Sequence, residues 1–302
     1  MRSAFVNTLK ELARKDERIF LVTADMGFSV FESFREEFPD RFLNTGIAEQ
    51  NTVGIAAGLA MSGKIVYVYS IIPFITMRCF EQIRLDLAYN NANVKLVGVG
   101  AGFTYGSMGS SHHAIEDISI MRSIPNMTVF CPGDPFETEE LIKRSYELPG
   151  PVYIRLGKNG EPVIHKNRNK IEIGKPISIT EGNDLILITT SNTLELAKSW
   201  VDEWGTEGIN VNLVSLPTIK PVDQLEIRKL IDRDIPIITL EEHSIIGGLG
   251  STISEIIAES GKGVKFKRMG INDMFSHYVG GADFQRKKLN ILQKPEKSWF
   301  LK

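Results

Sequence analysis

The sequence predicts an α/β protein of two layered domains, of which the first has a mostly parallel sheet and the second is smaller. The chain has 302 residues, a length that commonly corresponds to two domains. Short apolar runs alternate with longer segments of helical periodicity. The runs are almost continuously apolar, which is typical of strands that are buried on both faces of a parallel sheet.

The first domain, a layered α/β unit, is predicted over residues 1–165. Its N-terminal helix is amphipathic, because Phe5, Leu9 and Leu12 fall on one face. A later helical segment is rich in small residues, which allows a helix to pack closely on a sheet. The predicted strands are residues 19–23, 64–69, 94–99, 127–130 and 151–155. The predicted helices are residues 3–15, 49–62, 77–91, 114–123 and 135–147.

A linker is predicted at about residues 166–176, because this part of the chain is rich in Gly, Pro, Asn and Lys. The second domain is predicted over residues 177–302, where strands and helices continue to alternate. Its predicted strands are residues 185–189, 209–214, 235–240 and 264–269. Its predicted helices are residues 192–204, 223–233 and 251–260.

Composition and charge argue against several classes of protein. The formal net charge is -2 at pH 7, which gives no general attraction to nucleic acid or to an anionic membrane. The most apolar stretch, Ile65–Met77, is too short to span a bilayer, and the N-terminus lacks the apolar core of a signal peptide. Cys79 and Cys131 are too far apart for a metal or redox motif, and two lone thiols suit a reducing compartment. These features predict a cytoplasmic enzyme.

Three short motifs suggest ligand sites, but each lacks a part that the chemistry needs. Gly98–Phe103 has two glycines of a dinucleotide-binding loop, but the third is absent and the following residues are typical of a loop. Gly247–Ser251 precedes a helix without the lysine of a P-loop, so we expect a packing turn. His112 and His113 are adjacent and point in different directions, and no third ligand stands at a recognisable spacing, which argues against a metal site.

The most informative residues are Thr45–Asn51. An apolar stretch runs into Gly46, and Glu49 then opens the small-residue helix. A carboxylate in this place lies at the end of a strand and at the positive end of a helix dipole. On these residues alone, Glu49 is either a helix-capping acid or a functional carboxylate.

Further segments accompany this motif: Arg78–Arg84, His112–Ile118, Met121–Met127 and Thr239–Ser244, the last followed by a glycine cluster. Together and in this order, the five segments resemble the transketolase family of thiamin diphosphate enzymes. The resemblance implies a pyrimidine-binding domain followed by a transketolase C-terminal domain.

The resemblance also implies which residues contact the cofactor. Glu49 corresponds to the glutamate that bonds the aminopyrimidine ring and favours the imino tautomer, which takes the proton from the thiazolium carbon. Phe74 corresponds to an aromatic residue that lies against the pyrimidine, and an alternative register places Ile75 there. For either side chain, the plain alternative is core packing.

Other residues are implied to contact the substrate. His112 corresponds to a histidine that contacts the ketose, with a surface histidine as the plain alternative. Lys158 stands where the family often has an arginine for the sugar phosphate, with a solvated lysine as the alternative. The loop 25–29, including Ser29, is also expected to face the substrate. Met108 replaces an acid that is common in transketolases, so we expect a different substrate specificity.

One part of a complete active site is missing from the sequence. The family usually holds the diphosphate and its Mg²⁺ or Ca²⁺ with a Gly-Asp-Gly…Asn motif in a further domain, whereas Gly133–Pro135 lacks the second glycine. The resemblance therefore implies the smaller subunit of a split enzyme. Its N-terminal partner subunit would carry the diphosphate domain and hold most of the metal. We expect a heterotetramer in which this chain also pairs with a second copy of itself.

The predicted function is the transfer of a two-carbon ketol unit from a ketose or ketose phosphate to an aldose, within carbohydrate metabolism. Two alternatives share the cofactor: the β subunit of a 2-oxoacid dehydrogenase, and an enzyme similar to deoxyxylulose-phosphate synthase. An alternative of another class is a non-catalytic regulatory subunit. The presence of both Glu49 and His112 argues against that alternative.

Overall fold

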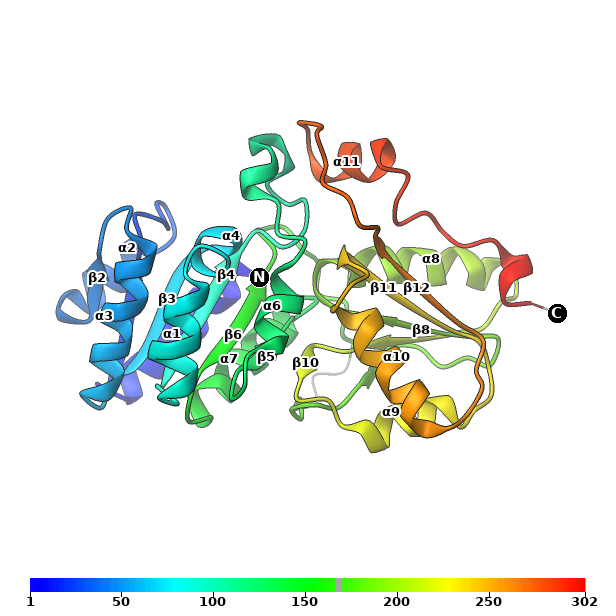
Figure 1. Cartoon of the computed structure of the whole chain (residues 1–302), viewed down its shortest axis with the longest axis horizontal. Helices are drawn as coiled ribbons and strands as arrows, with labels where there is room; N and C mark the ends of the chain where they lie inside the picture. Colours follow the sequence, from blue (N-terminus) through cyan, green and yellow to red (C-terminus); the bar gives the residue numbers. More distant parts are fainter. Residues whose placement is uncertain (167–169, 302) are drawn as a thin grey trace.

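The computed structural model describes residues 1–166 and 170–301, and it contains two sheets with helices on their faces (Figure 1). The larger sheet has seven strands, and all its neighbouring pairs are parallel except β10 with β5. In spatial order, the strands are β10 (Thr218–Lys220), β5 (Thr128–Phe130), β6 (Val152–Leu156), β4 (Val94–Val99), β3 (Ile65–Ile71), β1 (Ile19–Thr23) and β2 (Phe42–Asn44).

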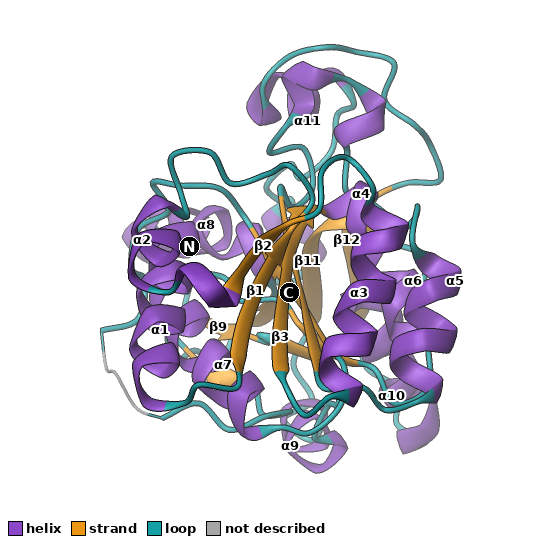
Figure 2. Cartoon of the chain, turned by 90° about the vertical axis from the view of Figure 1, so that its left-hand side faces the viewer, coloured by secondary structure: helices purple, strands orange, loops and turns teal. Residues whose placement is uncertain are grey.

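Helices cover both faces of this sheet (Figure 2). One face carries α1 (Arg2–Lys15), α2 (Glu32–Glu37) and α7 (Pro135–Glu147). The other carries α3 (Glu49–Met61), α4 (Ile72–Ile75), α5 (Phe80–Gln82), a π-helix (Ile83–Tyr89) and α6 (Asp117–Ser123). Because both faces are covered, the central strands β3, β4 and β6 are buried along their whole length, as the apolar runs predict.

The second sheet has five strands and is parallel except for its short edge strand β7. Its spatial order is β12 (Phe266–Ile271), β11 (Ile237–Ser244), β8 (Leu185–Thr189), β9 (Val211–Ser215) and β7 (Ile177–Ser178). The accompanying helices are α8 (Leu194–Thr206), α9 (Gln224–Ile231), α10 (Leu249–Ser260) and α11 (Ala282–Lys288). None of the helices in the described ranges is both long and apolar enough to cross a membrane.

The two sheets share structure across their junction. Strand β10 comes from the second half of the chain, but it pairs with β5 at the edge of the first sheet. One apolar cluster also contains Val68 and Leu96 of the first sheet together with Ile188 and Leu249 of the second half. The two halves therefore pack on a common core. The predicted domain limits at residues 165 and 177 stay a prediction, and residues 167–169 of the predicted linker lie outside the described residues.

The predicted fold class is confirmed: two α/β units with mostly parallel sheets follow one another along the chain. The helices and strands that the sequence analysis missed are short, namely α2, β2, α4, β7, β10 and α11. The single helix predicted over residues 77–91 is instead α5 followed by the π-helix. The chain makes a non-helical turn at Thr76–Cys79 before α5, because α4 ends at Ile75. This turn places Arg78 beside α3.

Candidate active site

Glu49 is the first residue of α3, the helix that follows β2. Gly46 supplies the turn between the two elements, because its φ of 73° lies in the left-handed region that favours glycine. Glu49 is only 3% exposed. Its carboxylate accepts a hydrogen bond from the Arg78 guanidinium rather than from a helix amide. Glu49 therefore forms an ion pair with Arg78 instead of capping the helix, and its role toward the cofactor stays a prediction.

A series of contacts connects Glu49 to the loop that carries His112. Arg78 Nη1 donates to Glu49 Oε2 over 2.7 Å. The guanidinium carbon of Arg78 lies 4.4 Å from the centroid of the Phe74 ring. The Phe74 ring in turn meets the His112 ring edge-on, with 5.0 Å between the centroids. The structure thus brings together three of the predicted site residues, which come from three separate segments.

The structure separates the two candidates for the aromatic position. Phe74 is partly buried and contacts both Arg78 and His112. Ile75 is 0% exposed and packs in the core between α3 and the first sheet. The burial of Ile75 makes Phe74 the more accessible of the two, so we propose Phe74 as the cofactor contact, and both assignments stay predictions.

The loop that carries His112 is closed at its base. Gly102 and Ala114 exchange two backbone hydrogen bonds of 3.0 Å each, which bring the two ends of the loop together. Arg155 Nη2 donates to the carbonyl oxygen of Ala114 over 2.9 Å, so a buried arginine fixes the same point. Within the loop, two short 3₁₀ helices, Gly106–Met108 and Ser110–His112, set the direction of the chain.

The adjacent histidines of this loop face different surroundings, as the sequence predicts. His112 contacts Phe74, and its Nδ1 lies 3.0 Å from Ser111 Oγ. His113 is buried against the ring of Phe103, 4.9 Å away between centroids. Burial lowers the pKa of both histidines, so each favours the neutral form. Within residues 1–166 and 170–301, no group of three His, Cys, Asp or Glu side chains is placed to hold a metal ion.

The remaining predicted substrate residues, Lys158 and Ser29, have neighbours outside the contact series of Glu49. Lys158 is exposed, and its Nζ lies 5.5 Å from the centroid of Tyr105, a residue of the His112 loop. Ser29 lines a cavity of about 160 Å³ that also includes Arg2 and Asn159. The structure thus forms two groups of predicted site residues. One contains Glu49, Phe74 and His112, and the other contains Ser29 beside Asn159, which follows Lys158 in the sequence.

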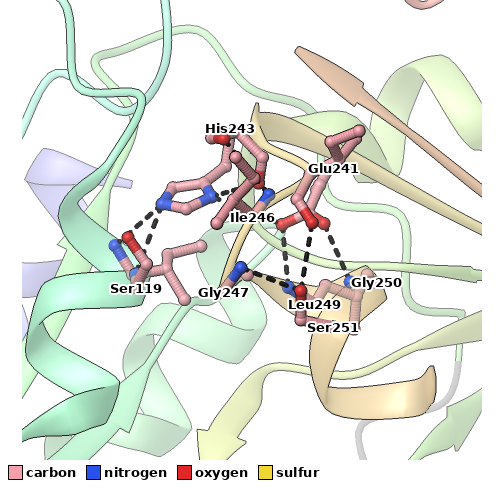
Figure 3. Close-up of polar contacts among 12 residues, drawn as sticks. Ser119, Glu241, His243, Ile246, Gly247, Leu249, Gly250 and Ser251 are labelled. Carbon is pink, nitrogen blue, oxygen red and sulfur yellow. Dashed lines mark hydrogen bonds and ion pairs between the residues drawn. The ribbon is translucent and has the colours of Figure 1, made fainter. Parts of the chain in front are cut away.

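The second half of the chain supports α6, the helix that follows the His112 loop (Figure 3). His243 at the end of β11 accepts hydrogen bonds at Nε2 from the backbone amides of Ile118 and Ser119, over 3.2 and 3.4 Å. Its Nδ1 lies 2.7 Å from the carbonyl oxygen of Ser244, which fixes the neutral tautomer with the proton on Nδ1. His243 therefore caps α6 from the second half of the chain.

The glycine cluster before α10 is a packing turn, also visible in Figure 3. The carboxylate of Glu241 accepts from the amides of Leu249 and Gly250, over 2.8 Å each, and so fills the start of the helix. A Cβ atom on Gly248 would lie 2.1 Å from Glu241 Oε2, which explains the glycine there. This helix start is occupied by the chain itself.

Sequence reasoning missed three residues of this arrangement: Arg78, Arg155 and His243. Arg78 lies in a segment that carries the family resemblance, but an arginine before a helix has no signal of its own. Arg155 lies at the end of a predicted strand. An arginine that is only 1% exposed is unusual, but this burial can be recognised only once the fold is known.

Comparisons with known proteins agree with this architecture. Residues 1–161 match the family described as "Transketolase, pyrimidine binding domain", and residues 174–285 match "Transketolase, C-terminal domain". A putative transketolase C-terminal section of Methanocaldococcus jannaschii is 42% identical over 286 residues, which are 94% of this chain and 89% of that protein.

Two further similarities concern divided enzymes. One subunit of the apulose-4-phosphate transketolase of Phocaeicola vulgatus is 38% identical over 289 residues, covering 92% of each chain. A solved structure described as a split gene transketolase, inactive beta4 tetramer, superposes with a TM-score of 0.86 at 35% identity. That match covers 96% of this chain and 93% of the other.

Proposed function

Because this chain belongs to the transketolase family, as a pyrimidine-binding domain followed by a C-terminal domain, we propose that the site around Glu49 is one half of a ketol-transferase active site. The chain is one subunit of a split transketolase-like transferase, whose reaction moves a two-carbon ketol unit from a ketose to an aldose. The observation that carries the proposal is the contact series from Glu49 through Arg78 and Phe74 to His112.

The residues present fit the pyrimidine ring of thiamin diphosphate, the cofactor of the family. Glu49 offers a buried carboxylate, and Phe74 offers a partly buried ring in the same contact series. A carboxyl group can hold or release a proton at ring nitrogen N1′, and an aromatic face packs against a heteroaromatic ring. When bound, thiamin diphosphate supplies a carbon nucleophile and an electron sink.

His112, Lys158 and Ser29 are the proposed substrate contacts. His112 adjoins Phe74, so it can donate a hydrogen bond to an oxygen of the reacting carbon chain. Lys158 lies over Tyr105 of the same loop, and its ammonium group suits a phosphate that is remote from the reacting carbons. The phosphorylated sugar in the name of the P. vulgatus relative supports a phosphorylated donor. The exposed Met108 beside His112 supports a specificity that differs from transketolases with an acid there.

The diphosphate and its Mg²⁺ or Ca²⁺ are proposed to be held mainly by an N-terminal partner subunit. This proposal is supported by the missing Gly-Asp-Gly…Asn motif and by the relatives, which are named as one section or one subunit of an enzyme. We propose a heterotetramer in which two copies of this chain also contact each other. Both cysteines are free and buried, which supports a reducing cytoplasm as the compartment.

Reconstitution with the N-terminal transketolase subunit tests the function. The pair is expected to bind thiamin diphosphate and to transfer a ketol unit from a ketose phosphate, whereas this chain alone binds the cofactor weakly and turns nothing over. Turnover by this chain, shown to be free of other subunits, would contradict the divided site. Activity that requires a 2-oxoacid and a lipoyl carrier protein would favour the dehydrogenase alternative instead.

A further inference from the structure

Arg78 makes two contacts in the free chain that the proposed cofactor would need for itself. Its guanidinium donates to the buried carboxylate of Glu49 over 2.7 Å. The same group lies over the ring of Phe74, 4.4 Å from the centroid. A guanidinium is planar, carries delocalised positive charge and donates from its edge. A protonated aminopyrimidine has the same three properties.

We infer that Arg78 takes the place of the pyrimidine ring in the free subunit and is displaced from Glu49 when thiamin diphosphate binds. The inference rests on the proposed function, because it assigns Glu49 and Phe74 to the pyrimidine. Arg78 binds Oε2 of Glu49 and lies over the Phe74 ring, so it contacts the two side chains that the pyrimidine is proposed to use.

The surroundings of Arg78 allow this exchange. The side chain of Arg78 is 46% exposed, whereas that of Glu49 is 4% exposed, so the arginine can move into solvent and the glutamate cannot. The backbone of Arg78 is held independently, because Gln50 Nε2 donates to its carbonyl oxygen over 3.1 Å. The arginine can therefore leave the carboxylate while its backbone stays attached to the first turn of α3.

The exchange also explains how a buried carboxylate is tolerated before assembly. A carboxylate with little access to water is costly without a partner, and Arg78 supplies both a charge and a hydrogen bond. The subunit thus keeps its site formed while it waits for cofactor and partner. Arg78 and the cofactor therefore compete for Glu49, and the affinity for thiamin diphosphate is lowered by the free energy needed to break the Glu49–Arg78 pair.

Substitution of Arg78 measures this competition directly. In the reconstituted pair, Arg78→Gln and Arg78→Met are expected to lower the dissociation constant of thiamin diphosphate about fivefold, which corresponds to about 1 kcal/mol. Binding is measured by isothermal titration calorimetry at fixed Mg²⁺, without substrate. Arg84→Gln is the matched control, because Arg84 lies on the next helical segment, is 57% exposed and is 3.9 Å from its nearest carboxylate, that of Glu81.

The free full-length chain gives a second measurement. Arg78→Met is expected to lower its melting temperature, since Glu49 loses its counter-charge, while Arg78→Gln keeps a donor and provides a folded variant if the first does not fold. Unchanged or weaker cofactor binding by both variants would overturn the inference and leave the proposed function standing. If even the wild-type pair does not bind thiamin diphosphate, the proposed function and this inference both fail.

Discussion

Arg155, near the end of β6, donates from Nε to Oδ2 of Asp117 over 2.8 Å, and the two side chains are 1% and 0% exposed. Arg155 also donates to Ser191 Oγ over 2.9 Å and to the carbonyl oxygen of Glu242 over 3.1 Å, both in the second half of the chain. Burial opposes the charge on Arg155, but Asp117 and the other groups beside it raise its pKa above the usual value. Through these hydrogen bonds and one to the carbonyl oxygen of Ala114, Arg155 connects the first sheet with the second half of the chain and with the base of the His112 loop.

Arg155→Met is expected to destabilise the chain by about 3–5 kcal/mol, because it leaves the carboxylate of Asp117 buried without its partner. Urea unfolding monitored by circular dichroism measures the change. The control is Arg14→Met, since Arg14 is 53% exposed in its pair with Glu37, and the loss of an exposed ion pair should cost far less. A loss for Arg155→Met no larger than that of the control would show that the buried pair does not hold the junction.

His243 makes the stability of the chain depend on pH. Burial lowers the pKa of His243 to about 4, because the charged imidazolium is poorly solvated there. The neutral ring accepts at Nε2 from the amides of Ile118 and Ser119. The unfolded histidine has a pKa of about 6.5, so the unfolded state binds the extra proton between pH 6.5 and 4. The stabilising contribution is complete above about pH 6.5 and declines as pH falls, by about 3 kcal/mol in all.

The measurement is the difference in unfolding free energy between wild type and His243→Asn at pH 7.5, 6 and 5. The comparison with the variant is needed because the neighbouring Glu241 also titrates: burial raises its pKa to about 7. A carboxyl group with a raised pKa makes the folded state more stable as pH falls, which opposes the effect of His243. The wild-type advantage should shrink at each lower pH. His277→Asn changes an exposed histidine and should show no such trend. An advantage that stays constant from pH 7.5 to 5 would contradict the role given to His243.

Much of the fold could be predicted because it follows from burial. β1, β4 and β8 begin and end at the predicted residues, since strands that are buried on both faces leave continuous apolar runs. Strand β10 could not be predicted, because it has three residues and pairs with a strand about ninety positions earlier. The local sequence pattern carries no information on such a distant strand partner, although β10 is one of the links between the second half of the chain and the first sheet.

The candidate site could be predicted only in part. Glu49 is marked by the glycine turn and by the small-residue helix behind it, and both are local features. Arg78 lies in the turn between α4 and α5, whereas the helix predicted over residues 77–91 would include it. Contacts between side chains that are far apart in the sequence depend on such turns. The partner of a long side chain such as Arg78 can therefore be identified only from the three-dimensional structure.

Glu49→Gln is expected to keep the fold and to slow removal of the C2 proton from bound thiamin diphosphate by about 10²- to 10⁴-fold, because an amide cannot share a proton. Hydrogen–deuterium exchange at C2, followed by NMR after acid quench in the reconstituted pair, measures this step. Glu81→Gln, which changes a carboxylate that is 60% exposed, serves as the control. Unchanged exchange in Glu49→Gln would move the proton-sharing role to another group.

His112→Ala is expected to lower kcat more than it raises KM. The ring of His112 adjoins Phe74, and burial lowers its pKa, so a neutral imidazole can donate to an oxygen that gains negative charge during the reaction. Steady-state kinetics with a panel of ketose phosphates provide the two constants. A rise in KM with unchanged kcat would instead assign His112 to uniform substrate binding.

Lys158→Ala is expected to show the opposite pattern, since the charge on a remote phosphate is the same in the substrate and in the transition state. Its KM for phosphorylated donors should rise with little change in kcat, and the defect should vanish for unphosphorylated ketoses. The same donor panel measures both variants, so His112→Ala and Lys158→Ala act as controls for each other. The exposed position of Lys158 over Tyr105 keeps the fold unaffected by the substitution. If Lys158→Ala matches wild type on every phosphorylated donor, the lysine is a solvated residue and the phosphate contact lies elsewhere.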